Sequence, residues 1–421
     1  MSRPSAETQD SSRSSPLSPG SVRRRHVLYV SGFDPKGPAH YHRLLGEQAA
    51  LAGALGGYRV EVGGRRRASE HSARWPLQYF SGSSVGGEVT VDTGFEFLRW
   101  DDIVRTHWTR NPAVLAWQLV STTLLYLHTG ALWKMLKLSW PPVLALVAPF
   151  VLLIGLLLSL PAAWLLASWV ATATGSWWAA ATAGLTVFGA AAGLALWTER
   201  RMNVQWLLRS YAFTALQGTR GCPELEGRVD HFAQIIVERV KAKPTCDEVL
   251  IVAHSSGGIV ATAALARALM LDPQLAAHGP RLSLLTLGQW SPLLSSLPTA
   301  QRFRDELACI ADQPAIDWVD FTAPPDGCCF ALTDPIAAAG LTARRPDHPR
   351  LLSPRFAELF STTRYAAVRR DRFRLHFQYL MTAERAGAYD FTAIIAGPMT
   401  LGERFASQPS VTDFRRFRLF G

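Results

Sequence analysis

The sequence predicts an α/β domain with a mostly parallel sheet flanked by helices, interrupted by a two-helix transmembrane hairpin. After residue 200, short apolar runs alternate with helical segments, which is typical of a parallel sheet and its connecting helices. Before it, from Leu138 to Thr198, no Asp, Glu, Lys or Arg occurs. Because one membrane span needs about 20 apolar residues, this stretch fits two spans and a tight turn.

The composition limits the class of protein. A chain of 421 residues, of which 48% are apolar and 14 are Trp, has room for one large domain or two ordinary ones. The net charge of +10 is carried by arginines spread along the chain, without a zinc finger, a basic helix or an aromatic-interleaved nucleic-acid motif. Nucleic acid is therefore not an expected partner, and the arginines are either solvated or in contact with anionic lipid headgroups.

Metal and disulfide patterns are missing from the sequence. The five cysteines are an odd number without CxxC or disulfide-framework spacing, which suits a reducing compartment. His40 and His42 would not share a face of a helix, and no HExxH, Walker A or Cys/His zinc pattern occurs. We therefore expect neither a metal nor an organic cofactor.

The first part of the predicted α/β domain spans residues 25–110, behind a Ser- and Pro-rich segment, 1–24, expected to be a disordered tail. The apolar run His26–Val30 predicts a buried strand, and a loop rich in Gly and Pro then leads into a helix over 39–55. Further strands are expected at 58–62, 88–91 and 95–100, with a Gly-, Arg- and Ser-rich loop between the first two.

The uncharged stretch predicts a transmembrane hairpin over residues 141–199, with spans at Val143–Trp169 and Ala179–Trp197. Pro149 and Pro161 would kink the first span, which helices in lipid tolerate. Tryptophans lie near the proposed ends, where amphipathic rings favour the headgroup level: Trp140, Trp177, Trp178 and Trp197.

Residues 111–140 precede the hairpin and contain an uncharged helical pattern that polar side chains interrupt. We expect this segment to lie in the membrane interface or to cover the site rather than to span. The strand at 26–30 and the segment around Ser255, after the hairpin, can join one sheet only if the chain crosses the membrane an even number of times between them. Two spans satisfy this condition, and a third span at 111–140 would not. Basic residues flank the hairpin and place both halves in the cytoplasm of a multi-pass inner-membrane protein: Arg110, Lys134, Lys137, Arg200, Arg201 and Arg209.

The second part of the α/β domain covers residues 200–421. Its predicted elements alternate as parallel α/β units do. In order, they are helices at 203–217 and 229–241, a strand at 249–253, a helix at 256–269, a strand at 282–287, a helix at 300–311 and a strand at 316–321.

Ser255 lies at the joint between the buried strand 249–253 and the Ala-rich helix that follows. The residues two before and two after it, Ala253 and Gly257, are both small, as a sharp turn with close strand and helix backbones requires. The new helix directs its free amides and positive dipole end at the serine. This pattern also suits a plain Ser-Gly turn. The buried strand, the serine and the Ala-rich helix follow one another directly, however, which favours a functional serine.

The joint resembles the nucleophile elbow of the α/β-hydrolase superfamily, although Ala253 stands where that family most often has glycine. The resemblance implies that Ser255 is a nucleophile and that the Ser256 amide helps to hold an oxyanion. It also implies a second amide from the loop after an early strand, for which Gly32 and Phe33 are the candidates.

The resemblance further implies an acid and then a histidine, in that chain order, after the serine. The acid would be Asp326, in a loop just past the strand at 316–321, or Asp320 within that strand. The histidine would be His376, in an His-x-x-Tyr segment similar to that of some lipase-like hydrolases, or His348 in a Pro-flanked loop. We favour Asp326 and His376.

The expected function is that of a membrane-anchored serine hydrolase, an esterase or lipase that cleaves an acyl ester through an acyl-enzyme. The membrane and an ester or lipid substrate are its expected partners. Two alternatives stay open: a non-catalytic membrane protein that uses a hydrolase fold for binding or scaffolding, and an acyltransferase with the same three residues.

Overall fold

The computed structural model describes residues 22–83 and 87–419, and the predicted tail falls mostly outside them. A nine-stranded, mostly parallel mixed sheet forms the centre, in the order β2-β4-β5-β1-β6-β7-β8-β9, with β3 pairing to β4. The strands from β5 to β9 along this path all run parallel. Their bounds are β1 Arg24–Val30, β2 Arg59–Val62, β3 Arg66–Ser69, β4 Ser72–Ser83, β5 Gly87–Leu98, β6 Glu248–His254, β7 Arg281–Leu287, β8 Asp317–Phe321 and β9 Arg350–Leu352.

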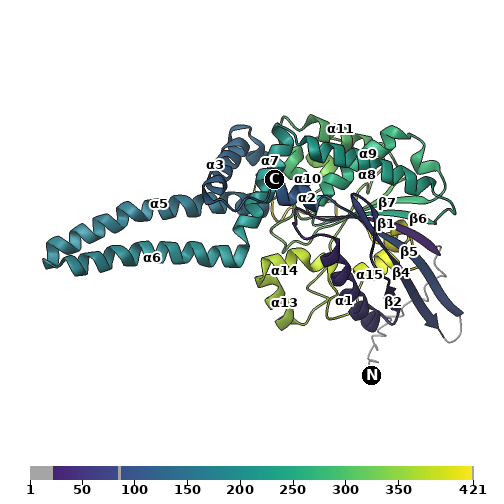
Figure 1. The fold of residues 1–421 in the computed structure, drawn as a ribbon, viewed down its shortest axis with the longest axis horizontal. Helices are drawn as coiled ribbons and strands as arrows, with labels where there is room; N and C mark the ends of the chain where they lie inside the picture. Colours follow the sequence, from purple (N-terminus) through teal and green to yellow (C-terminus); the bar gives the residue numbers. More distant parts are fainter. Residues whose placement is uncertain (1–21, 84–86, 420–421) are drawn as a thin grey trace, which may run out of the picture.

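Helices cover both faces of the sheet (Figure 1). α8 (Pro223–Lys241), α9 (Gly257–Leu271) and α11 (Gln301–Ala311) lie on one face, and α1 (Pro38–Gly56) lies on the other with the C-terminal helices. The remaining short helices are α2 Asp101–Thr106, α10 Ser291–Ser295, α12 Pro335–Ala338, α13 Thr362–Arg370, α14 Arg372–Phe377, α15 Phe391–Ala396 and α16 Leu401–Phe405, with 3-10 turns at Leu275–Ala277 and Gln378–Leu380.

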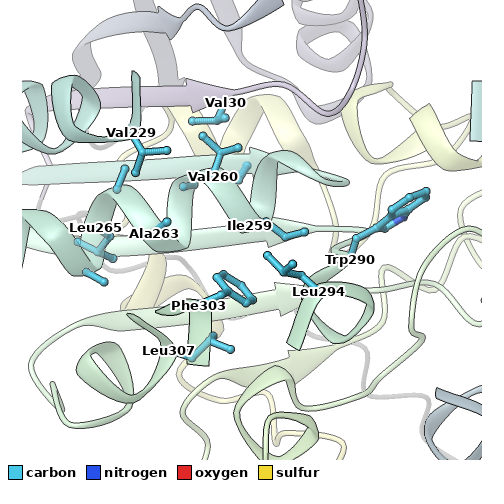
Figure 2. Close-up of a cluster of buried hydrophobic side chains, with 14 of the residues drawn as sticks. Val30, Val229, Ile259, Val260, Ala263, Leu265, Trp290, Leu294, Phe303 and Leu307 are labelled. Atoms are coloured by element: carbon cyan, nitrogen blue, oxygen red, sulfur yellow. The ribbon is translucent and has the colours of Figure 1, made fainter. Parts of the chain in front are cut away.

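Strand β6 is buried on both sides, which explains why its sequence is a continuous apolar run. Val249 and Ile251 join the core beneath α8, α9 and α11, whereas Leu250 and Val252 join the core on the opposite face. Figure 2 shows the first core, where side chains of α9 such as Val260 meet those of the neighbouring helices. Both faces together hold the end of β6, and hence Ser255, in place.

The edge of the sheet differs from the prediction. The segment expected to be a loop between two strands contains β3 and the 12-residue β4, and the strands expected at 88–91 and 95–100 are one strand, β5. On β4, Ala73, Trp75 and Leu77 point into the core, and the residues between them point away. This period-2 pattern marks a strand with one buried face, but the polar residues of the other face disguised it.

Two antiparallel helices, α5 (Trp140–Thr174) and α6 (Trp177–Met202), project from the domain as a hairpin (Figure 1). They contain the two predicted spans and are the two helices of the described residues that are long and apolar enough to cross a membrane. Gly175 joins them with a left-handed φ of 66°. Side chains such as Leu157 and Trp164 are more than half exposed, as lipid-facing side chains would be.

The segment 111–140 forms two helices, α3 (Pro112–His128) and α4 (Ala131–Leu138), beside the base of the hairpin. α3 packs on α7 (Val204–Thr219), and α4 packs on α3 and α5. The Tyr126 hydroxyl of α3 donates a hydrogen bond to the carbonyl of Leu293 in the domain. The outer side of this pair carries exposed aromatic rings, among them Trp117, which suit a membrane interface.

Asp320 is a buried carboxyl in the middle of the sheet, on β8. Its Oδ1 accepts a hydrogen bond from Thr286 Oγ1 at 2.6 Å, whereas Oδ2 has no partner among the described residues. Burial raises the pKa of Asp320 to about 7. The folded protein therefore keeps this proton at pH values where the unfolded chain, with an ordinary pKa of about 4, has lost it.

We expect Asp320 to lower the free energy of unfolding as the pH rises from about 4 to about 7, by up to about 4 kcal/mol, because the folded state then binds more protons than the unfolded state. Asp320→Asn removes this titration. Thermal unfolding of both proteins in detergent across this pH range measures the difference. Parallel stability profiles would show that Asp320 is ionised in the folded protein and would contradict the expectation.

Candidate active site

Ser255 lies in the turn between β6 and α9 and has a left-handed backbone, with φ of 57°. This conformation is strained for a side chain other than Gly or Asn, and such strain is common at functional turns. The turn is held because the Ser255 amide donates a hydrogen bond to the carbonyl of Leu287 on β7 at 2.8 Å. The serine side chain is thereby presented at the carboxyl edge of the parallel strands, where α/β proteins bind ligands.

Gly257 explains why a small residue is required two positions after the serine. A Cβ atom at this position would lie 2.4 Å from the carbonyl oxygen of Ser31 and 2.7 Å from that of Val30. The first turn of α9 could not approach β1 so closely with any larger residue. Ala253, two positions before the serine, is fully buried, so a methyl group is accommodated on that side.

Three side chains that are far apart in the sequence form a chain of hydrogen bonds. Ser255 Oγ lies 2.8 Å from His376 Nε2, and His376 Nδ1 lies 2.8 Å from Asp326 Oδ2. With the ring proton on Nδ1, His376 donates to the carboxylate, and its Nε2 can accept the proton of the serine hydroxyl. The structure thus brings together Ser255, His376 and Asp326.

The two alternative residues lie elsewhere. His348 is buried with Nε2 at 3.1 Å from the carbonyl oxygen of Ile310, and its ring packs on Trp318. The Asp320 carboxylate interacts with Thr286 and not with a histidine.

The Asp326 carboxylate is fixed on every side. In addition to His376, Oδ2 accepts a hydrogen bond from the Tyr379 hydroxyl at 3.1 Å, and Oδ1 accepts one from the Cys328 amide at 3.0 Å. Burial opposes the ionisation of Asp326, but the electrostatic interaction with His376 and these hydrogen bonds outweigh it and hold its pKa below the usual value. The carboxylate is therefore charged and points at the imidazole.

Tyr379 is a supporting residue whose role the sequence did not reveal, although it belongs to the His-x-x-Tyr segment. Its hydroxyl accepts a hydrogen bond from the Ala323 amide at 2.7 Å and donates to Asp326, so it ties the loop after β8 to the histidine segment. Gly288 provides space for the ring, since a Cβ atom there would lie 2.9 Å from Tyr379 Cε2.

His254 is a second supporting residue, which no sequence signal other than its place before Ser255 could have revealed. Its Nε2 donates to the backbone carbonyl of His376 at 2.8 Å, and the two rings lie 4.9 Å apart. Burial and the adjacent His376 lower the pKa of His254 to about 3. A neutral His254 therefore holds the histidine segment in position without placing a second charge beside His376.

The predicted oxyanion-binding amides lie around Ser255 but differ in availability. Among the residues that the structure describes, the Ser256 amide has no recorded acceptor. Gly32 lies directly against the nucleophile candidate, because a Cβ atom there would be 2.9 Å from Ser255 Cβ. The Phe33 amide instead donates to Ser256 Oγ at 2.8 Å, so it can bind a developing oxyanion only after the Ser256 hydroxyl turns away.

The site is covered by aromatic side chains. Ser255 is 2% exposed and His376 is fully buried. Trp206, on α7 directly after the hairpin, lies 5.9 Å from the His376 ring and donates through Nε1 to the carbonyl of Phe33 at 2.9 Å. Phe33 itself packs on Phe213 of the same helix. Ser255 and His376 are therefore almost inaccessible to solvent in this conformation.

Two groups of described residues each bring three possible metal-ligand atoms within 4.8 Å of one another: Asp326, Cys328 and His376, and His107, Cys222 and Glu224. In the first, Asp326 and His376 already share a hydrogen bond, and burial raises the pKa of the third member, Cys328, far above its usual value. Burial likewise raises the pKa of Cys222 in the second group, where Sγ lies 3.8 Å from His107 Nε2. Protonated thiols are poor ligands.

Comparison of the chain with protein-family models, with curated proteins and with solved structures found no match. The geometry of Ser255, His376 and Asp326 is therefore the main guide to the chemistry of this site.

Proposed function

We propose that the protein is a membrane-anchored serine hydrolase of the α/β-hydrolase type, which cleaves an acyl ester. The observation that carries the proposal is the unbroken hydrogen-bond chain from Ser255 Oγ through His376 to Asp326, on a serine with left-handed backbone at a strand-to-helix turn. The recurrence of this constellation on unrelated folds makes geometry and role, rather than sequence position, the criterion for recognising it.

In the proposed reaction, Ser255 Oγ attacks the ester carbonyl carbon while its proton moves to His376 Nε2. Asp326 stabilises the resulting imidazolium, and the Ser256 amide, near the N-terminus of α9, stabilises the oxyanion. The tetrahedral intermediate breaks its bond to the alcohol, which leaves with the proton from His376. Water then attacks the acyl carbon of the acyl-enzyme while its proton moves to His376 Nε2. The second tetrahedral intermediate releases the carboxylic acid, and His376 returns the proton to Ser255 Oγ.

The hairpin supports a location at the inner membrane with the α/β domain in the cytoplasm. Because α5 and α6 are antiparallel and both join the domain at one end, the two halves of the domain lie on the same side of the proposed membrane. Arg200 and Arg201 stand at this end of α6, in agreement with the excess of basic residues found on the cytoplasmic side of membrane proteins.

Acyl transfer to an alcohol other than water is a second candidate that uses the same residues. The near-complete burial of Ser255 favours it, because a covered acyl-enzyme is shielded from bulk water. Product analysis with and without added glycerol distinguishes the two: a transferase forms the new ester, whereas a hydrolase releases the free acid in both cases.

An active-site fluorophosphonate probe is expected to label the folded full-length protein in detergent, and peptide mapping should place the label on Ser255. The reason is that only a serine activated by a base is nucleophilic enough to react rapidly. Heat-denatured protein is the control and should not be labelled. Absence of labelling would favour the non-catalytic binding or scaffolding alternative, whereas labelling of another serine would contradict the assignment of Ser255 as the nucleophile.

A further inference from the structure

A cavity of about 960 Å³ lies where the hairpin meets the domain, next to the loop that carries Asp326. One wall comes from the domain ends of α5 and α6, and includes Trp140 and Trp197. A second wall is the loop Pro324–Cys328, which brackets Asp326, and a third comes from α13, the start of α14 and the C-terminal segment. Its volume suits a small ligand or part of a larger one.

The cavity is strongly basic. Its lining contains six arginines and no Asp or Glu. Arg355 pairs with the exposed Glu358 at 3.6 Å, and Arg372 donates to the carbonyl of Pro325 at 3.1 Å. For the other four, no ion pair is recorded among the residues that the structure describes: Arg201, Arg369, Arg370 and Arg416. Several arginines without counter-charges form a site for an anion such as a phosphate.

The hairpin side of the same cavity is apolar and exposed. Leu144 and Trp197 are 54% and 59% exposed, although they line the cavity with Trp140. The Trp140 amide donates to the carbonyl of Phe417 at 3.0 Å, which fixes the C-terminal segment against the base of α5. The basic wall therefore lies at the end of the hairpin where a membrane-spanning helix would leave the hydrocarbon for the headgroup layer.

We infer that this cavity binds the phosphate headgroup of an anionic phospholipid, with the acyl chains directed along α5 and α6, and that such a lipid is the substrate class of the Ser255 site. The second part of this inference rests on the proposed hydrolase function, whereas headgroup binding does not. Arginines at headgroup level match the phosphate, and the apolar helices match the chains.

A soluble phosphate or a phosphorylated metabolite would use the arginines but not the apolar wall. The continuity of that wall with the two helices long and apolar enough to cross a membrane favours the lipid. The loop Pro324–Cys328, shared between the cavity and the Asp326 carboxylate, is the direct connection between a bound headgroup and the buried site.

The test uses the full chain in detergent and its triple variant Arg369→Gln, Arg370→Gln, Arg416→Gln. Arg372 is left unchanged because it holds the loop beside Asp326. The matched control replaces three exposed arginines of the β2–β3 region, at the far end of the sheet from the hairpin (Figure 1), and removes the same charge: Arg65→Gln, Arg66→Gln, Arg67→Gln.

Phosphatidylglycerol is expected to raise the thermal unfolding midpoint of the parent and of the control, because it binds only the folded state. Phosphatidylcholine and inorganic phosphate should raise it much less, and the triple variant should lose the response. An equal response to phosphatidylcholine, or retention of the response in the triple variant, overturns the inference. An equal response to inorganic phosphate identifies a soluble anion as the ligand and also overturns it.

Hydrolysis provides the second measurement. The ratio of phosphatidylglycerol to phosphatidylcholine cleavage should fall about tenfold or more in the triple variant, since each lost charge-assisted contact weakens binding. The Arg65→Gln, Arg66→Gln, Arg67→Gln control should keep the ratio of the parent. If the parent cleaves a short neutral ester but shows no preference for phosphatidylglycerol over phosphatidylcholine, the lipid substrate assignment is wrong and the proposed hydrolase function stands. If lipid binds but no ester is cleaved, the proposed function fails and the headgroup site stands.

Discussion

Ser255→Ala is expected to lower kcat/KM for a short p-nitrophenyl ester by roughly 1,000-fold to 1,000,000-fold, because the variant cannot form the acyl-enzyme and retains only binding and oxyanion stabilisation. The stability of the fold should change little, since removal of the hydroxyl breaks only the hydrogen bond to His376. Release of p-nitrophenol by the purified protein in detergent measures the effect.

The matched control for this variant is Ser295→Ala, on α10. Ser295 is also buried, and its hydroxyl has no hydrogen-bond partner among the described residues, so its loss should leave kcat/KM within a few-fold of the parent. Equal activity of Ser255→Ala and the parent would show that ester cleavage, if present, takes place at another residue.

Asp326→Asn is expected to lower kcat by roughly 1,000-fold to 10,000-fold with little change in KM. The amide cannot stabilise the imidazolium, and as a donor it favours the His376 tautomer with its proton on Nε2, which cannot accept a proton from Ser255. Initial rates of ester cleavage over a range of substrate concentrations separate kcat from KM.

The control is the same chemical change at the other candidate acid, Asp320→Asn. Asp320 is equally buried but interacts with Thr286 rather than with the histidine. Its replacement should alter the pH dependence of stability and leave kcat within a few-fold of the parent. If Asp320→Asn abolished activity and Asp326→Asn did not, the acid of the proposed mechanism would be wrongly assigned.

Much of the architecture could be predicted because the relevant signals are local. The hairpin was visible as a long stretch without charges, and the joint at Ser255 was visible as a buried strand, a small residue, a serine and a helix in direct succession. The central strands β6, β7 and β8 were predicted well, because burial on both faces makes them mostly apolar, and Val249–Ala253 of β6 is a continuous apolar run. The half-buried strand β4 was missed, because its polar face interrupts such a run.

The candidate site could be predicted less completely, because its parts come from distant segments. Sequence order left two acids and two histidines open, and only the packing of the loop after β8 against α14 places Asp326, and not Asp320, beside His376. The occupation of the Phe33 amide by Ser256 Oγ and the cover formed by Trp206 also depend on contacts between distant segments.

By itself, the sequence determined the fold class, the apolar hairpin and the serine at the tight turn, since each depends on neighbouring residues whose periodicity and size act through the local backbone. Only the tertiary structure decided which carboxylate and which imidazole meet that serine, and which arginines gather at the base of the hairpin. The imidazole lies 121 residues from the serine, and the arginines come from separate elements. Their convergence follows from long-range packing on both faces of one sheet, which no local pattern encodes.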